Sequence, residues 1–310
     1  MNSRGDVRRM SERKSRISAS TRAGNGRRHK RGLYGSGLLG GLFGFALLVA
    51  SIPLAIGIAL LVMSWQGASS EPQELRAAIV DQLTLTEPNP SFAETVTELL
   101  QGAGYTVDYY PGEQVTVDFY RDLPTHEYDL LVLRAHTARF EENSLTLTDS
   151  VRRQEVLHAF GQDVFFFTSE PFDKTKYVEE RERFRLFAVR YRAQNGDERF
   201  FGVTPHFIES SMRGRFDCAT IIMMGCDGLL FDNTPKSLVG KGAKAVVGWD
   251  GLVSAAHTDA ATERLLQHLV VEGLPLGQAV QETMAEVGPD PSYGNALRLY
   301  PREAGGLTIR

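Results

Sequence analysis

The chain has 310 residues, of which 42% are hydrophobic and 23% charged, and its formal net charge is -4. This composition is ordinary for a globular protein, and the length suits one large domain or two small ones. The charges are uneven, because Arg and Lys crowd the first 32 residues, where Asp6 and Glu12 are the only acids. The remainder is therefore distinctly acidic, which argues against a nucleic-acid-binding body.

A long stretch without any charged residue follows, from Leu33 to Trp65. About 20 apolar residues span a bilayer, whereas the apolar core of a signal peptide has only about 7–15, so we expect an uncleaved transmembrane helix over 33–65. Basic residues precede this helix, and Glu71 and Glu74 follow it. The positive-inside rule then predicts a single-pass cell-membrane protein with a cytoplasmic N-terminus and an extracytoplasmic C-terminal domain.

Three segments besides the helix complete the predicted organisation. Residues 1–32 form a basic tail rich in Ser and Gly, which we expect to be disordered and cytoplasmic. Residues 66–74 are a linker, and residues 75–310 form one α/β domain. Glycines spaced four apart in the membrane helix (Gly37 with Gly41, Gly40 with Gly44) are compatible with close helix packing and a homodimer.

The domain alternates between short apolar runs and helical stretches, which predicts a mostly parallel sheet with helices on both faces. Strands are expected in five apolar runs, at 77–83, 105–109, 129–136, 219–226 and 243–249. Helices are expected between and after them, the first beginning with a capping box of Ser91 and Glu94 and the others near 234–239, 259–272 and 275–287.

The segment from about Phe140 to Thr204 fits this alternation less well. Asn195–Gly196 separates two apolar runs, at 185–192 and 200–203, and Asn-Gly between such runs is a strong hairpin signal. We therefore expect an antiparallel insertion here.

The two cysteines, Cys218 and Cys226, are the only ones in the chain. If a strand joins them, eight residues at about 3.3 Å each place them about 26 Å apart. A disulfide needs Cα atoms within about 7 Å, so both are expected to be free thiols.

His136 and Cys226 occupy the same kind of position, because each ends a buried strand. Functional groups gather beyond the carboxyl ends of parallel strands, so an imidazole and a thiol on neighbouring strands would lie within reach of each other. Such a pair is sufficient for nucleophilic catalysis. His257 is a second-choice partner, and Cys218 lies at the wrong end of its strand.

Three motifs in this order resemble the caspase-like cysteine peptidases, in particular the CHAT, clostripain, gingipain and separase groups. They are Leu-Leu-Val-Leu-Arg-Ala-His136, Thr-Ile-Ile-Met-Met-Gly-Cys226-Asp-Gly and Lys241-Gly-Ala-Lys-Ala-Val-Val-Gly-Trp249. The resemblance covers about residues 75 to 300 and implies a caspase-like three-layer sandwich. It also implies a His–Cys dyad, with an oxyanion hole built from the backbone N–H groups of Cys226 and Thr137.

Further residues are expected to shape this site. Gly225 and Gly228 flank the cysteine and leave room for substrate and for exposed N–H groups. Several groups of the family cleave after Arg or Lys by means of a pocket carboxylate. Asp227 and Asp250 are the candidates for that role, and Trp249 is the neighbouring candidate for substrate contact.

The sequence thus predicts a membrane-anchored cysteine endopeptidase acting on protein or peptide substrates. The alternative is a catalytically silent module of the same fold that binds a protein partner at the membrane. The family usually has Gly after the histidine, and Thr137 in its place favours this alternative, because a β-branched residue resists the backbone angles open to glycine. No metal or cofactor is expected, since the sequence lacks zinc-type spacing, a P-loop and a Rossmann fingerprint.

Overall fold

The computed structural model describes residues 74–139, 154, 156, 158–191 and 198–309, all of which belong to one compact unit, Glu71–Arg310. The predicted tail, membrane helix and linker up to residue 73 lie outside the described residues. Within the described part of the chain, no helix has the length and apolar character needed to cross a membrane.

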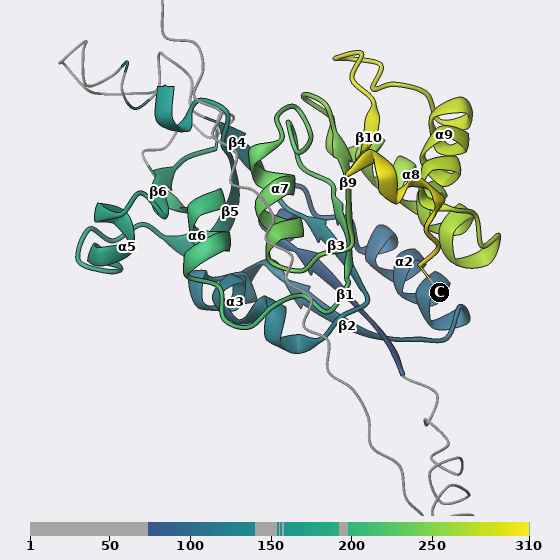
Figure 1. The fold of residues 1–310 in the computed structure, drawn as a ribbon, viewed down its shortest axis with the longest axis horizontal. Coiled ribbons are helices and arrows are strands. Elements are labelled where there is room, and N and C mark those ends of the chain that lie inside the picture. The colour runs from purple at the N-terminus through teal and green to yellow at the C-terminus, as the bar shows by residue number, and fades with distance from the viewer. Residues whose placement is uncertain (1–73, 140–153, 155, 157, 192–197, 310) are drawn as a thin grey trace, which may run out of the picture. The chain divides into compact units, whose positions relative to one another are not determined.

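A six-stranded sheet forms the centre of the domain (Figure 1). Its order is β2 (Tyr105–Pro111), β1 (Leu75–Asp81), β3 (Leu130–Arg134), β8 (Thr220–Met223), β9 (Ala245–Trp249) and β10 (Leu297–Tyr300). All neighbours pair in parallel except β9 and β10, which are antiparallel. The predicted α/β class with a mostly parallel sheet is confirmed.

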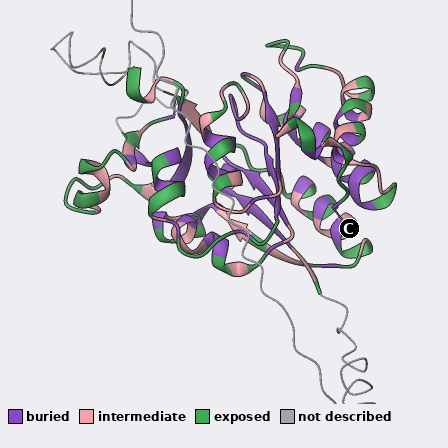
Figure 2. Cartoon of the chain, in the orientation of Figure 1, coloured by how far each residue is buried: buried purple, intermediate pink, exposed green. Residues whose placement is uncertain are grey.

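Helices cover both faces of this sheet, because alternate side chains of each strand enter different cores. Ile79 and Val132 face the core that contains α2 (Pro90–Gly102), α8 (Ala255–Leu266) and α9 (Leu276–Glu286). Their neighbours in sequence, Val80 and Leu131, face the core beside α3 (Val117–Asp122), α6 (Pro205–Ser210) and α7 (Asn233–Gly240). The inner strands β3, β8 and β9 are buried on both sides (Figure 2), which explains their near-continuous apolar sequences.

The predicted antiparallel insertion is also present, as a separate four-stranded sheet. Its order is β4 (Thr137–Arg139), β5 (Val164–Pro171), β7 (Phe200–Val203) and β6 (Leu186–Val189). A short helix, α5 (Val178–Glu182), precedes β6, and β6 and β7 pair as the hairpin signal predicted. The Asn195–Gly196 turn itself lies outside the described residues.

Several predicted boundaries of helices and strands are wrong. The first strand starts at Leu75 and ends at Asp81, and 82–85 form a 3-10 helix instead of its last residues. The capping box at Ser91 is not the start of α2, because Asn89 is the N-cap and its side-chain oxygen accepts the N–H of Phe92. Helix α8 ends at Leu266 and continues as a π-helical turn, 267–271. Strand β10 was not predicted.

Candidate active site

His136 and Cys226 follow two strands that pair directly with each other. Leu133 of β3 and Met223 of β8 are partners in the parallel register. His136 lies three residues beyond Leu133, and Cys226 lies three residues beyond Met223. The two residues therefore leave the same edge of the sheet at equivalent positions, the place where open parallel sheets gather functional groups.

The chain segments that carry these two residues touch. The hydroxyl of Thr137 donates a hydrogen bond to the carbonyl oxygen of Cys226. Gly225 makes the close approach possible, because a Cβ atom at this position would lie 2.5 Å from the carbonyl oxygen of Ala135 and 2.7 Å from the side chain of Thr137. Any side chain at position 225 would push the ends of β3 and β8 apart.

The imidazole of His136 is held from several sides. Its Nε2 shares a hydrogen bond of 2.8 Å with Oγ1 of Thr86. Its backbone N–H donates to Oε1 of Gln82 at 3.0 Å. The ring packs against two aromatic rings, with centroids 4.8 Å from that of Tyr191 and 5.9 Å from that of Phe167. Thr86 and Gln82 are therefore parts of the site that the sequence analysis missed.

The resting thiol and imidazole are both neutral near pH 7. Burial, with a smaller contribution from the nearby Arg134 charge, lowers the pKa of His136 to about 4. Burial likewise raises the pKa of Cys226, whose Sγ–H donates to the carbonyl oxygen of Val253 at 3.5 Å. An uncharged imidazole can accept a proton from the thiol, although a pKa of about 4 makes it a weak base at pH 7, and the resting site contains no preformed thiolate–imidazolium pair.

A buried charge network fixes the segment that contacts His136. Arg134, with 1% of its side chain exposed, bonds Asp81 through Nη1 and Asp259 through Nε and Nη2, at 2.8–2.9 Å. Its Nη2 also donates to the carbonyl oxygen of Glu87 at 2.8 Å. Because these partners bracket 82–86, the network orders the turn that supplies Gln82 and Thr86. A charged residue inside the apolar run before His136 was the available sequence signal.

The backbone around the expected oxyanion hole is extended at Thr137 and turns sharply after Cys226. Thr137 is the first residue of β4, where it pairs with Phe166, and a β-branched residue fits such extended backbone well. Its backbone therefore does not need the angles special to glycine. Asp227, directly after the cysteine, has a left-handed backbone with φ of 59°. This conformation turns the chain sharply after Cys226, and Gly228 is buried beside Met223.

The expected substrate-binding residues have other contacts. The buried carboxylate of Asp227 pairs with Nε of Arg139 at 3.3 Å. Asp250 pairs with Nε of Arg298 at 2.8 Å, and its other oxygen accepts the N–H of Ala296. Trp249 is fully buried, with its indole N–H donated to the hydroxyl of Thr258 at 2.9 Å, which leaves this side chain in the core.

His257 and Cys218, the other histidine and cysteine considered for the site, have contacts unlike those of His136 and Cys226. His257, on α8, packs on Trp249 with centroids 5.4 Å apart and shares a hydrogen bond of 3.1 Å with the carbonyl oxygen of Gly288. Cys218 is an exposed free thiol before β8, at the edge of the sheet opposite to Cys226.

Among the residues that the structure describes, no group of three or more His, Cys, Asp and Glu side chains is arranged to hold a metal ion. Comparison with known proteins found no family model and no curated protein that matches the chain. Any functional assignment therefore depends on the fold, an α/β domain with a mostly parallel sheet flanked by helices, and on the residues at the carboxyl edge of that sheet.

Proposed function

We propose that this protein is a cysteine endopeptidase with a caspase-like three-layer sandwich, acting on protein or peptide substrates. One observation carries the proposal: His136 and Cys226 extend from paired strands at equivalent positions, and the hydroxyl of Thr137 bonds the carbonyl oxygen of Cys226. A nucleophile and a general base brought to one sheet edge are the minimum that acyl transfer requires.

The reaction begins with the two neutral groups described above. His136 accepts the thiol proton as Sγ of Cys226 attacks the scissile carbonyl carbon. The C–N bond breaks, the imidazolium returns its proton to the leaving amine, and a thioester remains. Water, deprotonated by His136, then hydrolyses the thioester and restores the thiol. Since Nε2 is bonded to Thr86, Nδ1 is the nitrogen available for these transfers.

The carbonyl oxygen becomes negatively charged in the tetrahedral intermediate and needs N–H donors. Those of Cys226 and Thr137 are the proposed donors, with Gly225 and Gly228 shaping the space around them. Asp227 is the proposed pocket acid for an Arg or Lys side chain, in which case the substrate would displace Arg139 from its 3.3 Å pair. Asp250 and Trp249 are the weaker candidates, because each is held by contacts within the fold.

The proposed location is the cell membrane. The uncharged stretch 33–65 supports a single-pass anchor, and the basic residues before it support a cytoplasmic N-terminus with residues 75–310 outside the cytoplasm. The glycine spacing within this stretch is compatible with a homodimer.

A second candidate function is a catalytically silent module that binds a protein partner at the membrane. A specific observation favours it. The imidazole of His136 is bonded to Thr86 and the thiol of Cys226 to Val253, so each reactive group has a partner other than its proposed counterpart.

Hydrolysis of a mixed fluorogenic peptide library separates the two functions. We would assay the full chain, reduced and reconstituted in lipid nanodiscs, beside Cys226→Ala and His136→Ala variants and the matched Cys218→Ala control. A peptidase predicts cleavage by the wild type and by Cys218→Ala alone, and a preference for Arg or Lys would assign the pocket acid. Equal signals from all four folded proteins would favour the binding module.

A further inference from the structure

A cavity of about 330 Å³ lies beside the C-terminal end of α7, away from the residues of the candidate active site. It is lined by residues of α6, of the loop after α6 and of the end of α7, namely Glu209, Arg215, Lys236, Ser237, Gly240 and Lys241. Three of these six side chains are cationic and one is anionic, so the lining carries a net positive charge.

The cations around this cavity lack carboxylate partners. Among the described residues, the side chains of Arg215 and Lys236 have no ion-pair or hydrogen-bond partner, and Nζ of Lys241 donates to the carbonyl oxygen of Met212 at 2.7 Å. Glu209 is the one acid of the lining, and its Oε1 accepts a hydrogen bond of 2.7 Å from the hydroxyl of Ser237, which also lines the cavity. The one carboxylate of the lining therefore offsets only part of the charge of its three cations.

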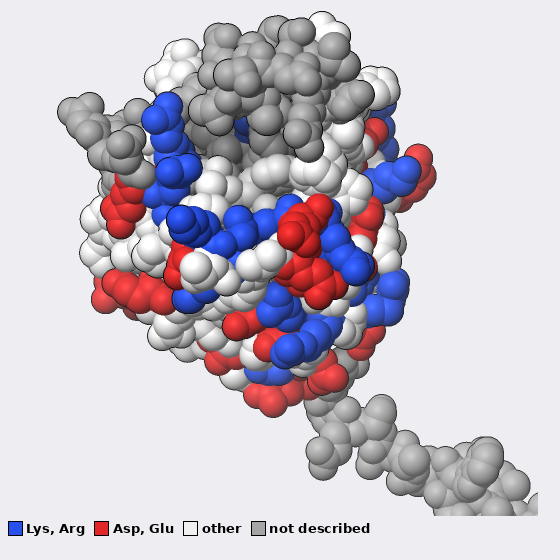
Figure 3. Space-filling model, turned by 90° about the vertical axis from the view of Figure 1, so that its left-hand side faces the viewer, with Lys and Arg blue, Asp and Glu red and all other residues white. Residues whose placement is uncertain are grey.

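Nine other arginines among the described residues are matched with acids. Arg76, Arg121, Arg134, Arg139, Arg183, Arg185, Arg213, Arg264 and Arg298 each lie within 4.0 Å of a carboxylate. Figure 3 shows the same mixing, with positive and negative side chains interspersed on the side of the domain that faces left in Figure 1. The three cations around this cavity differ in this respect from those nine arginines.

The positive charges of Lys241 and Arg215 also repel each other. The pKa of Lys241 is lowered, first by burial and second by the positive charge of Arg215. An anion in the cavity would weaken both effects, because it would give the partly buried ammonium group of Lys241 a charged partner and offset the repulsion between the two cations.

We propose that this cavity is a second site, which binds a phosphate group, either of a free phosphate compound or of a phospholipid headgroup. Cations contributed by α7 and by the loop after α6 approach from separate chain segments, which suits the several oxygens of a phosphate. A Cβ atom at Gly240 would meet nothing within 4 Å, so this part of the lining is open.

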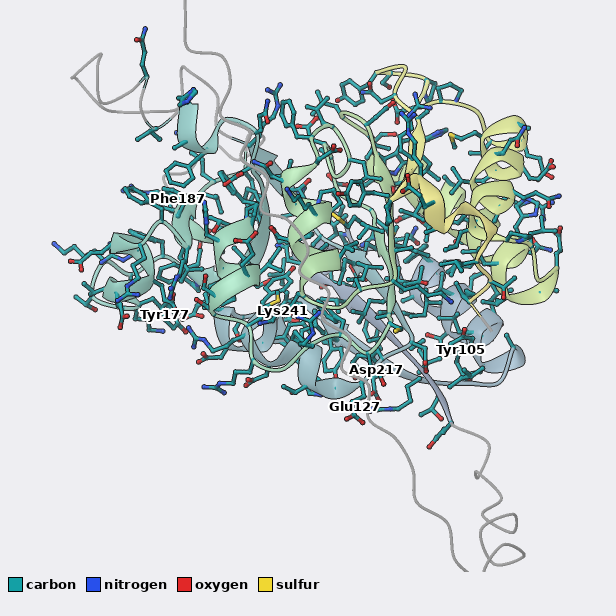
Figure 4. All side chains as sticks on the ribbon, viewed as in Figure 1. Tyr105, Glu127, Tyr177, Phe187, Asp217 and Lys241 are labelled. Carbon is teal, nitrogen blue, oxygen red and sulfur yellow. The ribbon has the colours of Figure 1, made fainter. Side chains whose placement is uncertain are left out.

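The place of the site in the fold separates it from the candidate active site. Lys241 precedes β9, and Ala245 at the start of β9 lies in register, through β8 and β3, with Ala77 near the start of β1. Figure 4 shows Lys241 on the same lower side of the sheet as Glu127 and Asp217, which also precede strands. His136 and Cys226 lie at the opposite, carboxyl edge.

Calorimetric titration of inorganic phosphate into the full chain tests the proposal. The protein is held in phosphatidylcholine nanodiscs at fixed ionic strength, and the wild type is compared with Arg215→Gln and Lys236→Gln. The matched control is Lys174→Gln, because Lys174 is an exposed lysine outside the cavity lining. We expect saturable binding by the wild type and the control, and affinity about tenfold lower or worse in each cavity variant.

A second titration distinguishes the two sources of the phosphate group. Phosphatidic acid is added to the nanodiscs, and weaker apparent binding of inorganic phosphate would assign the site to a lipid headgroup. Unchanged binding would assign it to a free phosphate compound. The proposal fails if the wild type shows no saturable binding, if both cavity variants bind like the wild type, or if acetate binds as tightly as phosphate.

Discussion

Arg134 and Asp259 form a two-pronged ion pair inside the domain, with Nε bonded to Oδ1 at 2.8 Å and Nη2 to Oδ2 at 2.9 Å. Asp81 adds a single bond of 2.8 Å to Nη1 of the same guanidinium. The network thus contains two carboxylates and one cation, all nearly inaccessible to solvent. The two acids are not equivalent, because burial raises the pKa of Asp81 despite its contact with Arg134.

This difference between Asp81 and Asp259 predicts different losses of unfolding free energy when each of the two is replaced by Asn. Asp259→Asn removes the charge that is bonded twice, and breaking a buried pair in this way is expected to lower the free energy of unfolding by about 3–5 kcal/mol. Asp81→Asn leaves Arg134 paired with Asp259 and removes a carboxylate whose burial is costly, so a loss of about 1–2 kcal/mol is expected.

Urea unfolding followed by circular dichroism measures both losses. Glu94→Gln is the control, since Glu94 is exposed on α2, and its effect should stay within about 0.5 kcal/mol. Equal losses for the two aspartates, or a larger loss for Asp81→Asn, would contradict the assigned network.

The lowered pKa of His136 predicts a specific dependence of stability on pH. The unfolded chain takes up this proton near the ordinary histidine pKa of 6.5, whereas the folded chain takes it up only at a pKa of about 4. The stability that depends on neutral His136 is therefore complete above pH 6.5 and is lost as the pH falls toward 4. The loss is about 3 kcal/mol over this window.

Unfolding free energies of the wild type and of His136→Gln, measured between pH 7.5 and 4, isolate the contribution of this one group from the carboxylates that titrate in the same range. The wild type should lose more stability than the variant on acidification. Parallel curves for the two proteins would show that the imidazole is not buried in the way described.

The layout of the fold was predictable because strands buried on both faces require long apolar runs. The runs that became β3, β8 and β9 could be found in this way, and His136 and Cys226 follow the carboxyl ends of two of them. The adjacency of β3 and β8 was only a condition of the prediction, and the structure supplies it. Strand β10 was missed because it is a short edge strand whose sequence, Leu297-Arg-Leu-Tyr300, contains a charged residue. A strand of four residues gives almost no periodic signal of its own, and β10, unlike the equally short β8, does not lie within a longer apolar run.

The immediate partners of His136 were not predictable in the same way. Thr86 lies 50 residues earlier in the chain, and its contact with the imidazole depends on how the 3-10 turn after β1 is oriented. The spacing of residues along the sequence gives no information about how this turn is oriented. Arg134 was a usable signal, because a guanidinium in a buried strand requires acidic partners, yet nothing in the sequence identified Asp81 and Asp259 as those partners.

The raised pKa of Cys226 predicts slow alkylation of this thiol in the absence of substrate. Only the thiolate reacts with iodoacetamide, and burial keeps Cys226 protonated, whereas Cys218 is exposed. At pH 7 we expect Cys218 to be modified on the order of tenfold faster than Cys226. Mass spectrometry of peptides from a timed reaction measures both rates in one sample.

A His136→Ala variant serves as the comparison for this reaction. Because both groups are neutral at rest, the variant should change the rate of Cys226 by less than about threefold at pH 7. Rapid modification of Cys226 that depends on His136 would instead indicate a thiolate–imidazolium pair in the resting protein.

Gly225 is expected to be the least tolerant glycine near the candidate site. In Gly225→Ala the new Cβ would lie 2.5 Å from the carbonyl oxygen of Ala135, and backbone atoms cannot yield as a flexible side chain does. The ends of β3 and β8 must separate, at an expected cost of about 1–3 kcal/mol in unfolding free energy. Gly102→Ala is the matched control, because a Cβ there meets nothing within 4 Å at the end of α2, and it should be neutral or stabilising by up to about 1 kcal/mol. Thermal and urea unfolding of both variants check this difference. If Gly225→Ala is as stable as Gly102→Ala, the segments that carry His136 and Cys226 do not approach as closely as described, and the basis for a shared reactive site is lost.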